Sequence, residues 1–188
     1  MKVGLFFGTF NPVHNGHVEI VTQLLNKKIF NQIWIILSPR SPHKKFNLIN
    51  KEARLEMLNI TFKNYDNVVI SDVEFKFNPP NYTIDTLSYL SNKFSKKIFA
   101  IIMGSDNYIK INSWRNSQEI QEKYSIYVYP REGAQIKNKN SRKINYLDFP
   151  IIKISSSSIR EGIANKKDII TRYLPPNVYD FIKKNNLY

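Results

Sequence analysis

The sequence predicts an α/β fold in which helices cover both faces of a central parallel sheet. Two observations lead to this prediction. Short apolar runs alternate along the chain with segments whose apolar residues recur at helical spacing. Glycine, proline and polar residues collect where the apolar runs end. Strands that alternate with helices pair in parallel through right-handed crossovers, and their ligands bind beyond the carboxyl ends of the strands.

The individual elements follow in chain order from these patterns. The predicted strands are 2–7, 33–37, 67–71, 97–103, 124–129 and 150–154. The predicted helices are 17–28, 51–63, 83–94, 116–122, 157–165 and 176–184. Segment 130–149 is the least regular, and its Arg-Glu-Gly turn and Lys- and Asn-rich continuation predict a flexible, exposed loop. The 188 residues suffice for one sizeable core, so we expect a single domain over 1–188.

The composition excludes several classes of protein. The chain has no cysteine, which excludes disulfides and thiolate metal sites. No segment approaches the ~20 apolar residues that cross a bilayer, so we expect a cytoplasmic protein with no membrane partner. The net charge of +13 favours anionic partners, but charge alone does not choose among nucleic acid, acidic lipid and a phosphorylated small molecule. Because the lysines are not clustered with aromatic residues, we expect no nucleic-acid partner.

The most informative segment is 8–17, GTFNPVHNGH, which links the first predicted strand to the first predicted helix. Glycine, proline and asparagine turn the chain, and His14 and His17 then lie three residues apart where the helix starts, so that they can face one ligand. A helix N-terminus presents unpaired N–H groups and the positive end of the helix dipole. Two imidazole donors at this place therefore favour an anion, most naturally a phosphate. Capping of the helix and metal binding are the alternatives for this pair.

Further polar clusters follow other predicted strands. They are 38–45 (SPRSPHKK), Gly104-Ser105-Asp106 and 154–160 (ISSSSIR), which opens a late helix. Each has an ordinary alternative, since serines cap helices, lysines form solvated surface, and Trp114 and Tyr82 suit a core. Together, at one predicted edge of the sheet, they favour a cradle for a polyanion. The chain has no GxxxxGK[ST] loop and no GxGxxG turn, which argues against a P-loop ATPase and a standard dinucleotide-binding dehydrogenase.

Segments 8–17 and 154–160 resemble the two signatures of the nucleotidyltransferase superfamily, GxFxPx[HT]xGH and ISSxxIR. Within that superfamily the chain is similar to the bacterial nicotinate-nucleotide adenylyltransferases over essentially its whole length. The other matching blocks are 41–44 (SPHK), Arg54-x-x-Met57, 81–87 (NYTIDTL), 102–106 (IMGSD), Trp114 and 172–178 (RYLPPNV). The resemblance implies a Rossmann-like nucleotidyltransferase fold. It also implies transfer of the adenylyl group of ATP to nicotinate mononucleotide, with Mg²⁺, to give nicotinate adenine dinucleotide and pyrophosphate in NAD biosynthesis.

The resemblance further implies the residues of the site. The catalytic residues would be His14, His17, Lys44 and Arg160. ATP would be bound by Gly8, Thr9, Phe10, His14, His17, Gly104, Asp106, Ser156, Ser157 and Arg160. Nicotinate mononucleotide would be bound by Lys44, Thr83, Thr86, Trp114 and Arg131, with its ring stacked on Trp114. No side chain is expected to bind the metal, because Mg²⁺ keeps waters and binds substrate phosphates.

Two features depart from the family pattern. Arg115 follows Trp114 where the family places an aromatic residue, which either weakens ring stacking or adds a cation near the substrate carboxylate. The serines at 157 and 158 replace the Thr-Asp pair commonest in this family, and the serine-rich form somewhat resembles the pantetheine-phosphate branch. Nicotinamide mononucleotide and phosphopantetheine therefore stay open as alternative acceptors. The oligomeric state also stays open, with a homo-oligomer among the options.

Overall fold

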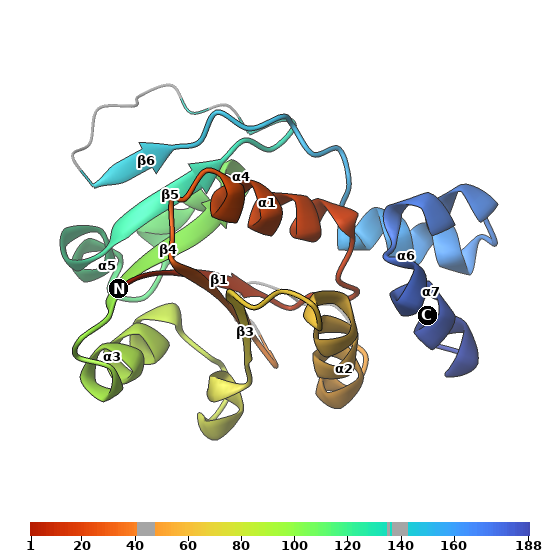
Figure 1. Ribbon diagram of the computed structural model, residues 1–188, viewed down its shortest axis with the longest axis horizontal. Helices are drawn as coiled ribbons and strands as arrows, with labels where there is room; N and C mark the ends of the chain where they lie inside the picture. The colour runs from red at the N-terminus through yellow and green to blue at the C-terminus, as the bar shows by residue number, and fades with distance from the viewer. Residues whose placement is uncertain (41–47, 135, 137–142) are drawn as a thin grey trace.

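The computed structural model describes residues 1–40, 48–134, 136 and 143–188, which form a six-stranded sheet with helices on both faces (Figure 1). The strands are β1 (Lys2–Gly8), β2 (Gln32–Leu37), β3 (Val68–Ser71), β4 (Ile98–Gly104), β5 (Ser125–Tyr129) and β6 (Ile144–Tyr146). Their order in the sheet is β3-β2-β1-β4-β5-β6, and every neighbouring pair is parallel. The predicted fold class is confirmed, because this is the strand order of a doubly wound Rossmann sheet.

Seven α-helices and three short 3₁₀ helices lie between these strands or after the last of them, within the described ranges. The α-helices are α1 (Asn15–Asn26), α2 (Lys51–Phe62), α3 (Thr83–Lys93), α4 (Ser105–Tyr108), α5 (Ser117–Lys123), α6 (Ser156–Ala164) and α7 (Pro176–Lys184). The 3₁₀ helices are η1 (Val73–Lys76), η2 (Ile111–Ser113) and η3 (Asp168–Tyr173). Local chemistry sets several of the boundaries. Asn50 caps α2 by accepting a hydrogen bond from the main-chain N–H of Glu52 at 2.6 Å, and Pro176 starts α7, where its missing N–H costs nothing.

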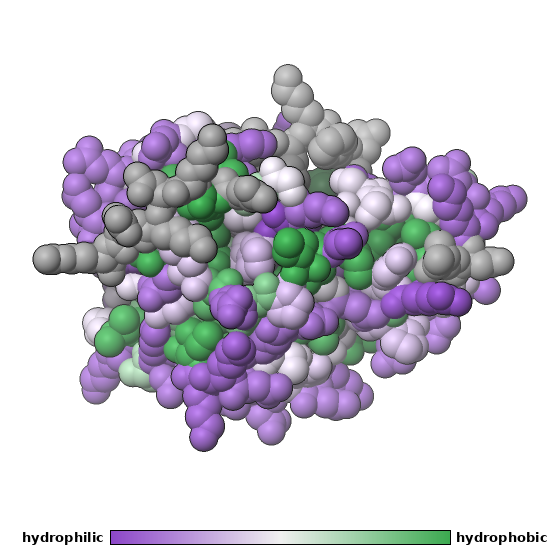
Figure 2. All heavy atoms as spheres, turned by 90° about the horizontal axis from the view of Figure 1, so that it is seen from above, coloured by the Kyte–Doolittle hydropathy of each residue, from purple (hydrophilic) through white to green (hydrophobic). Residues whose placement is uncertain are grey.

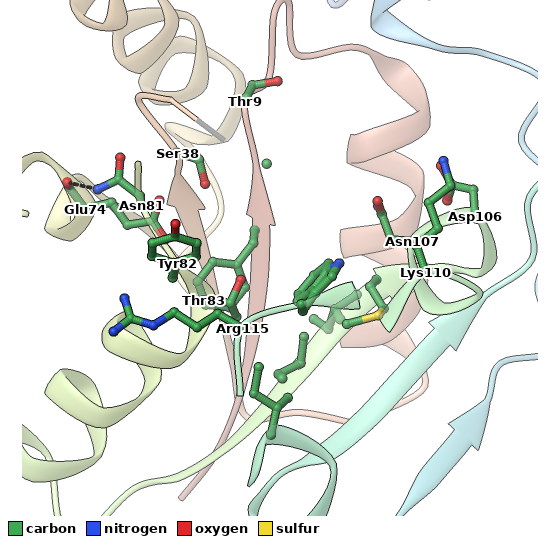
Figure 3. Close-up of a pocket in the computed structure, with 17 residues that line it drawn as sticks. Thr9, Ser38, Glu74, Asn81, Tyr82, Thr83, Asp106, Asn107, Lys110 and Arg115 are labelled. Atoms are coloured by element: carbon green, nitrogen blue, oxygen red, sulfur yellow. Dashed lines mark hydrogen bonds between the residues drawn. The ribbon is translucent and has the colours of Figure 1, made fainter. Parts of the chain in front are cut away.

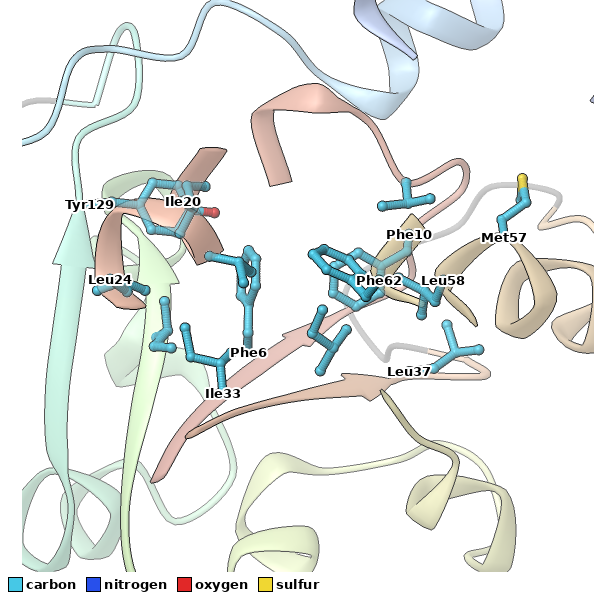
Figure 4. Close-up of a cluster of buried hydrophobic side chains, with 14 of the residues drawn as sticks. Phe6, Phe10, Ile20, Leu24, Ile33, Leu37, Met57, Leu58, Phe62 and Tyr129 are labelled. Carbon is cyan, nitrogen blue, oxygen red and sulfur yellow. The ribbon is translucent and has the colours of Figure 1, made fainter. Parts of the chain in front are cut away.

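An apolar core lies on each face of the sheet. In β1, Val3 and Leu5 face one core and Phe6 faces the other, because successive side chains of a strand point to opposite faces. The core that contains Phe6 is covered by α1, α2, α6 and α7, and Figure 4 shows part of it. The core that contains Leu5 is covered by α3 and α5. Burial on both faces explains why the central strands are almost continuously apolar in sequence.

The centre of the sheet is the place where the strand order reverses. β1 and β4 lie side by side, and Phe6 pairs with Ile102, although β2 and β3 come between them in the chain. The chain leaves β1 toward β2 on one side and leaves β4 toward β5 on the other. The loops after β1 and β4 therefore diverge, and the crevice between such loops is where doubly wound proteins bind ligands.

The sixth strand is not where the sequence predicts it. The prediction of a strand over 150–154 is wrong, and so is that of a loop throughout 130–149, because β6 lies at Ile144–Tyr146. Ile144 pairs with Ile126 of β5 and is buried in the core. The burial of this one residue is enough to form a short strand in an otherwise polar segment. Pro150 has no N–H to contribute to a sheet, and Ile151 is 53% exposed.

The other differences concern helix boundaries and short helices. α1 begins at Asn15, two residues before the predicted start, and His14 is its N-cap. The short helix α4 and the 3₁₀ helices are absent from the prediction, because they have too few turns to show a helical period. The predicted helix 176–184 matches α7.

The face of the molecule seen from above is largely hydrophilic. Figure 2 views the molecule from above relative to Figure 1 and shows hydrophilic residues over most of this face, with apolar patches between them. No helix in the described ranges is long and apolar enough to cross a membrane.

Candidate active site

Two adjoining cavities lie at the carboxyl ends of β1 and β4. The histidine cavity has a volume of 260 Å³, and its polar lining residues include Thr9, His14, His17, Asp106, Asn107, Arg131, Ser155, Ser156, Ser157 and Arg160. The tryptophan cavity has a volume of 330 Å³, and its lining includes Ser38, Glu74, Asn81, Tyr82, Thr83, Asp106, Asn107, Lys110, Trp114 and Arg115. Phe7, Gly8, Thr9, Asp106 and Asn107 line both cavities. Two ligands bound in these cavities would therefore meet at the end of β1.

The two histidines form one unit at the start of α1. Their rings stack with 3.7 Å between centroids and 29° between planes. The main-chain N–H of His14 donates to Nδ1 of His17 at 3.2 Å. Since Nδ1 accepts this hydrogen bond, a neutral His17 carries its proton on Nε2, which is then the donor atom of the ring. Both rings lie at the N-terminus of α1, as predicted, and the ring of His17 also takes part in capping the helix, one of the alternatives for this pair.

His14 is the more buried of the two and is neutral at physiological pH. It is 3% exposed, and burial lowers its pKa to about 3, helped by the positive charge of Arg131. Its Nδ1 has no hydrogen-bond partner among the described residues. His14 can therefore offer a neutral imidazole to an anion, and it does not supply a positive charge in the free protein.

The serines at 155–158 have two roles. Two of them cap α6, and the other two form hydrogen bonds beside the histidine cavity. Ser155 and Ser158 form a reciprocal capping box, in which each side chain accepts from the main-chain N–H of the other at 3.1 and 3.2 Å. Ser156 donates to the carbonyl of Pro12 at 2.8 Å. Ser157 accepts a hydrogen bond from Nη2 of Arg160 at 3.2 Å. The N-terminus of α6 is thereby fixed against the β1–α1 loop, with a guanidinium beside it.

The β1–α1 loop, residues 9–14, has an unusual backbone held by two arginines. Phe10 is buried with φ of 43°, a left-handed conformation that is rare for a bulky side chain and typical of strained functional loops. The carbonyl of Thr9, before it, accepts from Nη1 of Arg54 at 2.9 Å. The carbonyl of Asn11, after it, accepts from Nη1 of Arg160 at 2.7 Å. The strained residue is thus fixed on both sides.

Arg54 also holds the loop after β2. It is 1% exposed, and besides Thr9 it donates to the carbonyls of Ser38, Pro39 and Ile49 at 3.0 to 3.1 Å. Its partners are main-chain carbonyls rather than a carboxylate. One buried guanidinium therefore joins the carboxyl ends of β1 and β2, where both loops begin.

The tryptophan cavity combines rings with the N-terminus of α3. Figure 3 shows Tyr82, Thr83 and Arg115 on one side of it and Asp106, Asn107 and Lys110 on the other. Tyr82 is the N-cap of α3, so the first N–H groups of this helix begin at the cavity wall. The guanidinium of Arg115 lies 4.8 Å from the ring centroid of Tyr82 and 3.5 Å from Asp85.

A buried acid supports this wall from behind. Glu74 is 1% exposed and accepts a hydrogen bond from the hydroxyl of Thr86 at 2.9 Å, and its main-chain carbonyl accepts from Asn81 at 2.8 Å. Burial raises the pKa of Glu74, while hydrogen bonds from Ser38 and Thr86 act in the opposite direction. Glu74 thereby connects η1 with the first turn of α3.

The end of β4 brings Asp106 and Arg131 next to each other. A Cβ at Gly104 would collide with the side chains of Asp106 and Arg131, so glycine permits their close approach. The main-chain N–H of Arg131 donates to Ser105, and its Nη1 donates to the carbonyls of Ile152 and Ile154 at 3.4 and 3.0 Å. Arg131 thus ties the chain before α6 to the end of β5.

Most of the residues implied by the resemblance gather here. Gly8, Thr9, Phe10, His14, His17, Asp106, Ser156, Ser157 and Arg160 line the histidine cavity, and Thr83 and Trp114 line the tryptophan cavity. Arg131, expected at the acceptor nucleotide, lines the histidine cavity. Gly104 lines neither cavity, and Thr86 is fully buried with its hydroxyl directed at Glu74. Lys44 lies outside the described residues.

Sequence reasoning missed several residues of the site. Glu74, Asn107 and Lys110 line the tryptophan cavity without belonging to a recognisable motif, and Ser38 and Asn81 lie in segments that the sequence singles out without a role for either residue. The role of Arg54 had a detectable signal, because it shares the buried face of α2 with Met57 and Leu58 at helical spacing. A charged residue on an otherwise apolar stripe indicates a specific buried partner.

The carboxylates fit a substrate-borne cation better than a protein-held one. Within the described ranges, no three His, Cys, Asp or Glu side chains come together as a metal site. Asp106 is the carboxylate shared by both cavities. One carboxylate beside an anion site suits Mg²⁺, which typically takes one or two carboxylates, several waters and substrate phosphates.

Comparison with known proteins gives consistent results. The family model described as Cytidylyltransferase-like matches residues 5–162. A protein of Flavobacterium psychrophilum named as a probable nicotinate-nucleotide adenylyltransferase is 41% identical, with 100% of this chain and 99% of that protein covered. A similarly named protein of Bacteroides fragilis is 36% identical over 95% of this chain and 89% of its own length. The structure of the Plasmodium falciparum nicotinic acid mononucleotide adenylyltransferase complexed with NaAD superposes with a TM-score of 0.85 at 22% identity, covering 100% of this chain and 97% of that one.

Proposed function

The chain belongs to the nicotinate-nucleotide adenylyltransferases within the cytidylyltransferase-like family, and from this premise we propose how its two cavities divide the reaction. The enzyme transfers the adenylyl group of ATP to nicotinate mononucleotide and releases pyrophosphate. In this proposal the histidine cavity holds the phosphates of ATP, and the tryptophan cavity holds the acceptor. The observation that carries the proposal is the wall of Gly8, Thr9 and Asp106 that the two cavities share.

The chemistry needs alignment and charge neutralisation more than a side-chain base. An oxygen of the acceptor phosphate attacks the α-phosphorus of ATP, and the bond from that phosphorus to the oxygen that bridges to the β-phosphate breaks, so that pyrophosphate leaves. The attacking phosphate has a second pKa near ~6 and is largely ionised at neutral pH. Because no proton has to be removed, the main barriers are the mutual repulsion of two anions and the charge that develops on the leaving group.

The histidine cavity supplies donors for that charge. Nε2 of His17 donates to the α-phosphate, with the neutral His14 beside it. Ser157, Arg160 and the N-terminus of α6 bind the β- and γ-phosphates, since a helix N-terminus and a guanidinium both favour phosphate. The strained β1–α1 loop directs main-chain N–H groups at the same phosphates. Lys44 keeps its predicted role as a further cation for both substrates.

The acceptor side favours a carboxylate over an amide. The nicotinate ring stacks on Trp114, and its carboxylate lies at the N-terminus of α3, near Thr83. The positive end of a helix dipole stabilises an anion more than a neutral amide. Arg115 pairs with Asp85 in the first turn of α3 and so offsets the one negative charge of that turn.

Mg²⁺ is the proposed divalent cation, and Asp106, the carboxylate that lines both cavities, would be its candidate protein ligand. When bound, the cation neutralises part of the polyphosphate charge. Asp106 also suits hydrogen bonds to ribose hydroxyls, so its carboxylate has two candidate partners on ATP.

The direct test is pyrophosphate release from ATP and Mg²⁺ with three acceptors in parallel. Nicotinate mononucleotide should react with the highest kcat/KM, ahead of nicotinamide mononucleotide and phosphopantetheine. A preference for either of the other two would retain the assignment of the histidine cavity and overturn that of the tryptophan cavity. Release with none of the three would contradict the proposal as a whole.

A further inference from the structure

The backbone of the β1–α1 loop needs more support than ligand-binding residues alone provide. Phe10 is held at a φ of 43°, and such conformations persist only where the surroundings fix the neighbouring peptide groups. Arg54 holds the residue before it, and Arg160 holds the carbonyl of Asn11 after it. Arg160, however, is also a candidate phosphate ligand, so a bound polyphosphate competes for the same guanidinium.

Tyr188 supplies an additional contact at this point. Its hydroxyl donates to Oδ1 of Asn11 at 2.7 Å, across 177 positions of the chain. Asn11 is 1% exposed, and this is the one hydrogen bond that its side chain makes with the described residues. Burial raises the pKa of Tyr188, against the opposing effect of Arg160 and Arg54, so the hydroxyl keeps the proton that it donates.

The segments around Tyr188 hold the loop in other places too. Ser156 of α6 donates to the carbonyl of Pro12 at 2.8 Å, and Asn15 at the start of α1 donates to the carbonyl of Arg172 at 3.0 Å. The last third of the chain thus contacts the loop at successive positions. Figure 1 shows α6 and α7 at the same end of the molecule, where α6 contacts η3 and α7 contacts α2.

We propose that Tyr188 is a positioning residue for the phosphate site: its hydrogen bond to Asn11 keeps the β1–α1 loop in its binding conformation while Arg160 turns to the phosphates. The inference rests on the proposed function in naming ATP as the ligand of that loop. Tyr188 lines neither cavity and need not touch a substrate. Its effect reaches ATP through Asn11 and through the peptide group that follows Phe10.

The test compares wild type with Tyr188→Phe, a change that removes only the hydroxyl oxygen. Calorimetric titration with ATP and Mg²⁺ should show a Kd raised about fivefold to tenfold, the size of one buried hydrogen bond. The KM for nicotinate mononucleotide should change less than about twofold, because Thr9 is the one residue of the loop 9–14 among those that line the tryptophan cavity. In the absence of ATP, the main-chain amides of residues 9–14 should exchange their hydrogens faster in Tyr188→Phe than in wild type.

Tyr179→Phe is the matched control. Tyr179 lies on α7 and packs against the same core, and its hydroxyl has no hydrogen bond to residues 9–14 in the described part of the chain. This variant should bind ATP as wild type does. In a double-mutant cycle, Tyr188→Phe should add little to Asn11→Ala, because both changes remove the same contact.

Several results would overturn the inference. Unchanged ATP binding in Tyr188→Phe is one, and an equal loss for both substrates together with a lower Tm is another, because that pattern describes general structural support. A wild-type protein that binds ATP but transfers no adenylyl group would contradict the proposed function alone. In that case the ATP titrations of wild type and Tyr188→Phe would still test the role of Tyr188 independently.

Discussion

The ring of His14 lies against the ring of His17, with 3.7 Å between their centroids, where the first helix of the chain begins. The two side chains nevertheless differ in their surroundings. His14 is buried and neutral, whereas His17 is half-buried and lines the cavity, with its Nδ1 accepting from the main chain of His14. The proposed division of labour gives the donor role at the α-phosphate to His17 and a packing and orienting role to His14.

Substitution of His17 should affect the chemical step. We expect His17→Ala to lower kcat by roughly 10²–10³, the loss typical of one donor to a developing oxyanion. Steady-state kinetics with both substrates at saturation would measure this. An unchanged kcat with a higher KM for ATP would assign His17 to ground-state binding only.

The pKa of His14 predicts how stability depends on pH. Its value is about 3 in the folded protein, against roughly 6.5 in the unfolded chain, so the unfolded chain binds a proton first as the pH falls. Stability should therefore decrease as the pH drops below about 6.5. Between pH 7.5 and pH 5, the titration of His14 should lower the free energy of unfolding by about 2 kcal/mol.

The variant His14→Asn isolates that contribution, because asparagine does not titrate. Urea unfolding at the two pH values should show a smaller loss of stability for the variant than for wild type. Equal losses in the two proteins would mean that His14 is accessible to protons in the folded state.

Arg115 should act on acceptor choice rather than on ATP. Its ion pair with Asp85 is about half exposed, so Arg115→Ala should have only a modest effect, a rise of roughly twofold to fivefold in the KM for nicotinate mononucleotide. Nicotinamide mononucleotide, which carries no carboxylate, should be affected less. A parallel KM series for the two acceptors measures this, and Arg115→Lys, which retains the charge, is the control. Equal changes in the KM values for both acceptors would show that Arg115 does not contribute to the choice between them.

Loss of Arg54 should destabilise the whole protein. Arg54→Met leaves four main-chain carbonyls, two of them in buried hydrogen bonds, without their donor, and we expect the free energy of unfolding to fall by more than about 3 kcal/mol. Arg54→Lys should recover only part of this loss, since one ammonium cannot reach all four carbonyls. Denaturant unfolding measures the loss of stability in both variants. Arg172→Lys, a change at an exposed position, is the control. A near-wild-type Arg54→Met would show that these carbonyls find other donors.

The sequence predicts the sheet and the histidine cavity well because both depend on local patterns. Apolar runs mark the central strands, and the segments around His14 and Ser156 lie where two helices begin. It fails at β6, because the pairing of Ile144 with Ile126 is a long-range contact that leaves little trace in composition. Glu74 and Tyr188 are missed for the same reason, because their roles depend on hydrogen bonds to residues that are distant in the chain.

The two cavities share the end of β1 and two residues of α4, Asp106 and Asn107, and otherwise draw on different parts of the chain. Apart from the shared residues, the tryptophan cavity is lined by Ser38, the end of β4 and two segments, 74–83 and 110–120, whereas the histidine cavity draws on α1 and α6. Acceptor preference can therefore evolve, or be engineered, by exchange of two short segments while the nucleotide-triphosphate end is inherited unchanged. A chimera that carries these two segments from a relative with another acceptor should retain ATP binding and adopt the donor's acceptor.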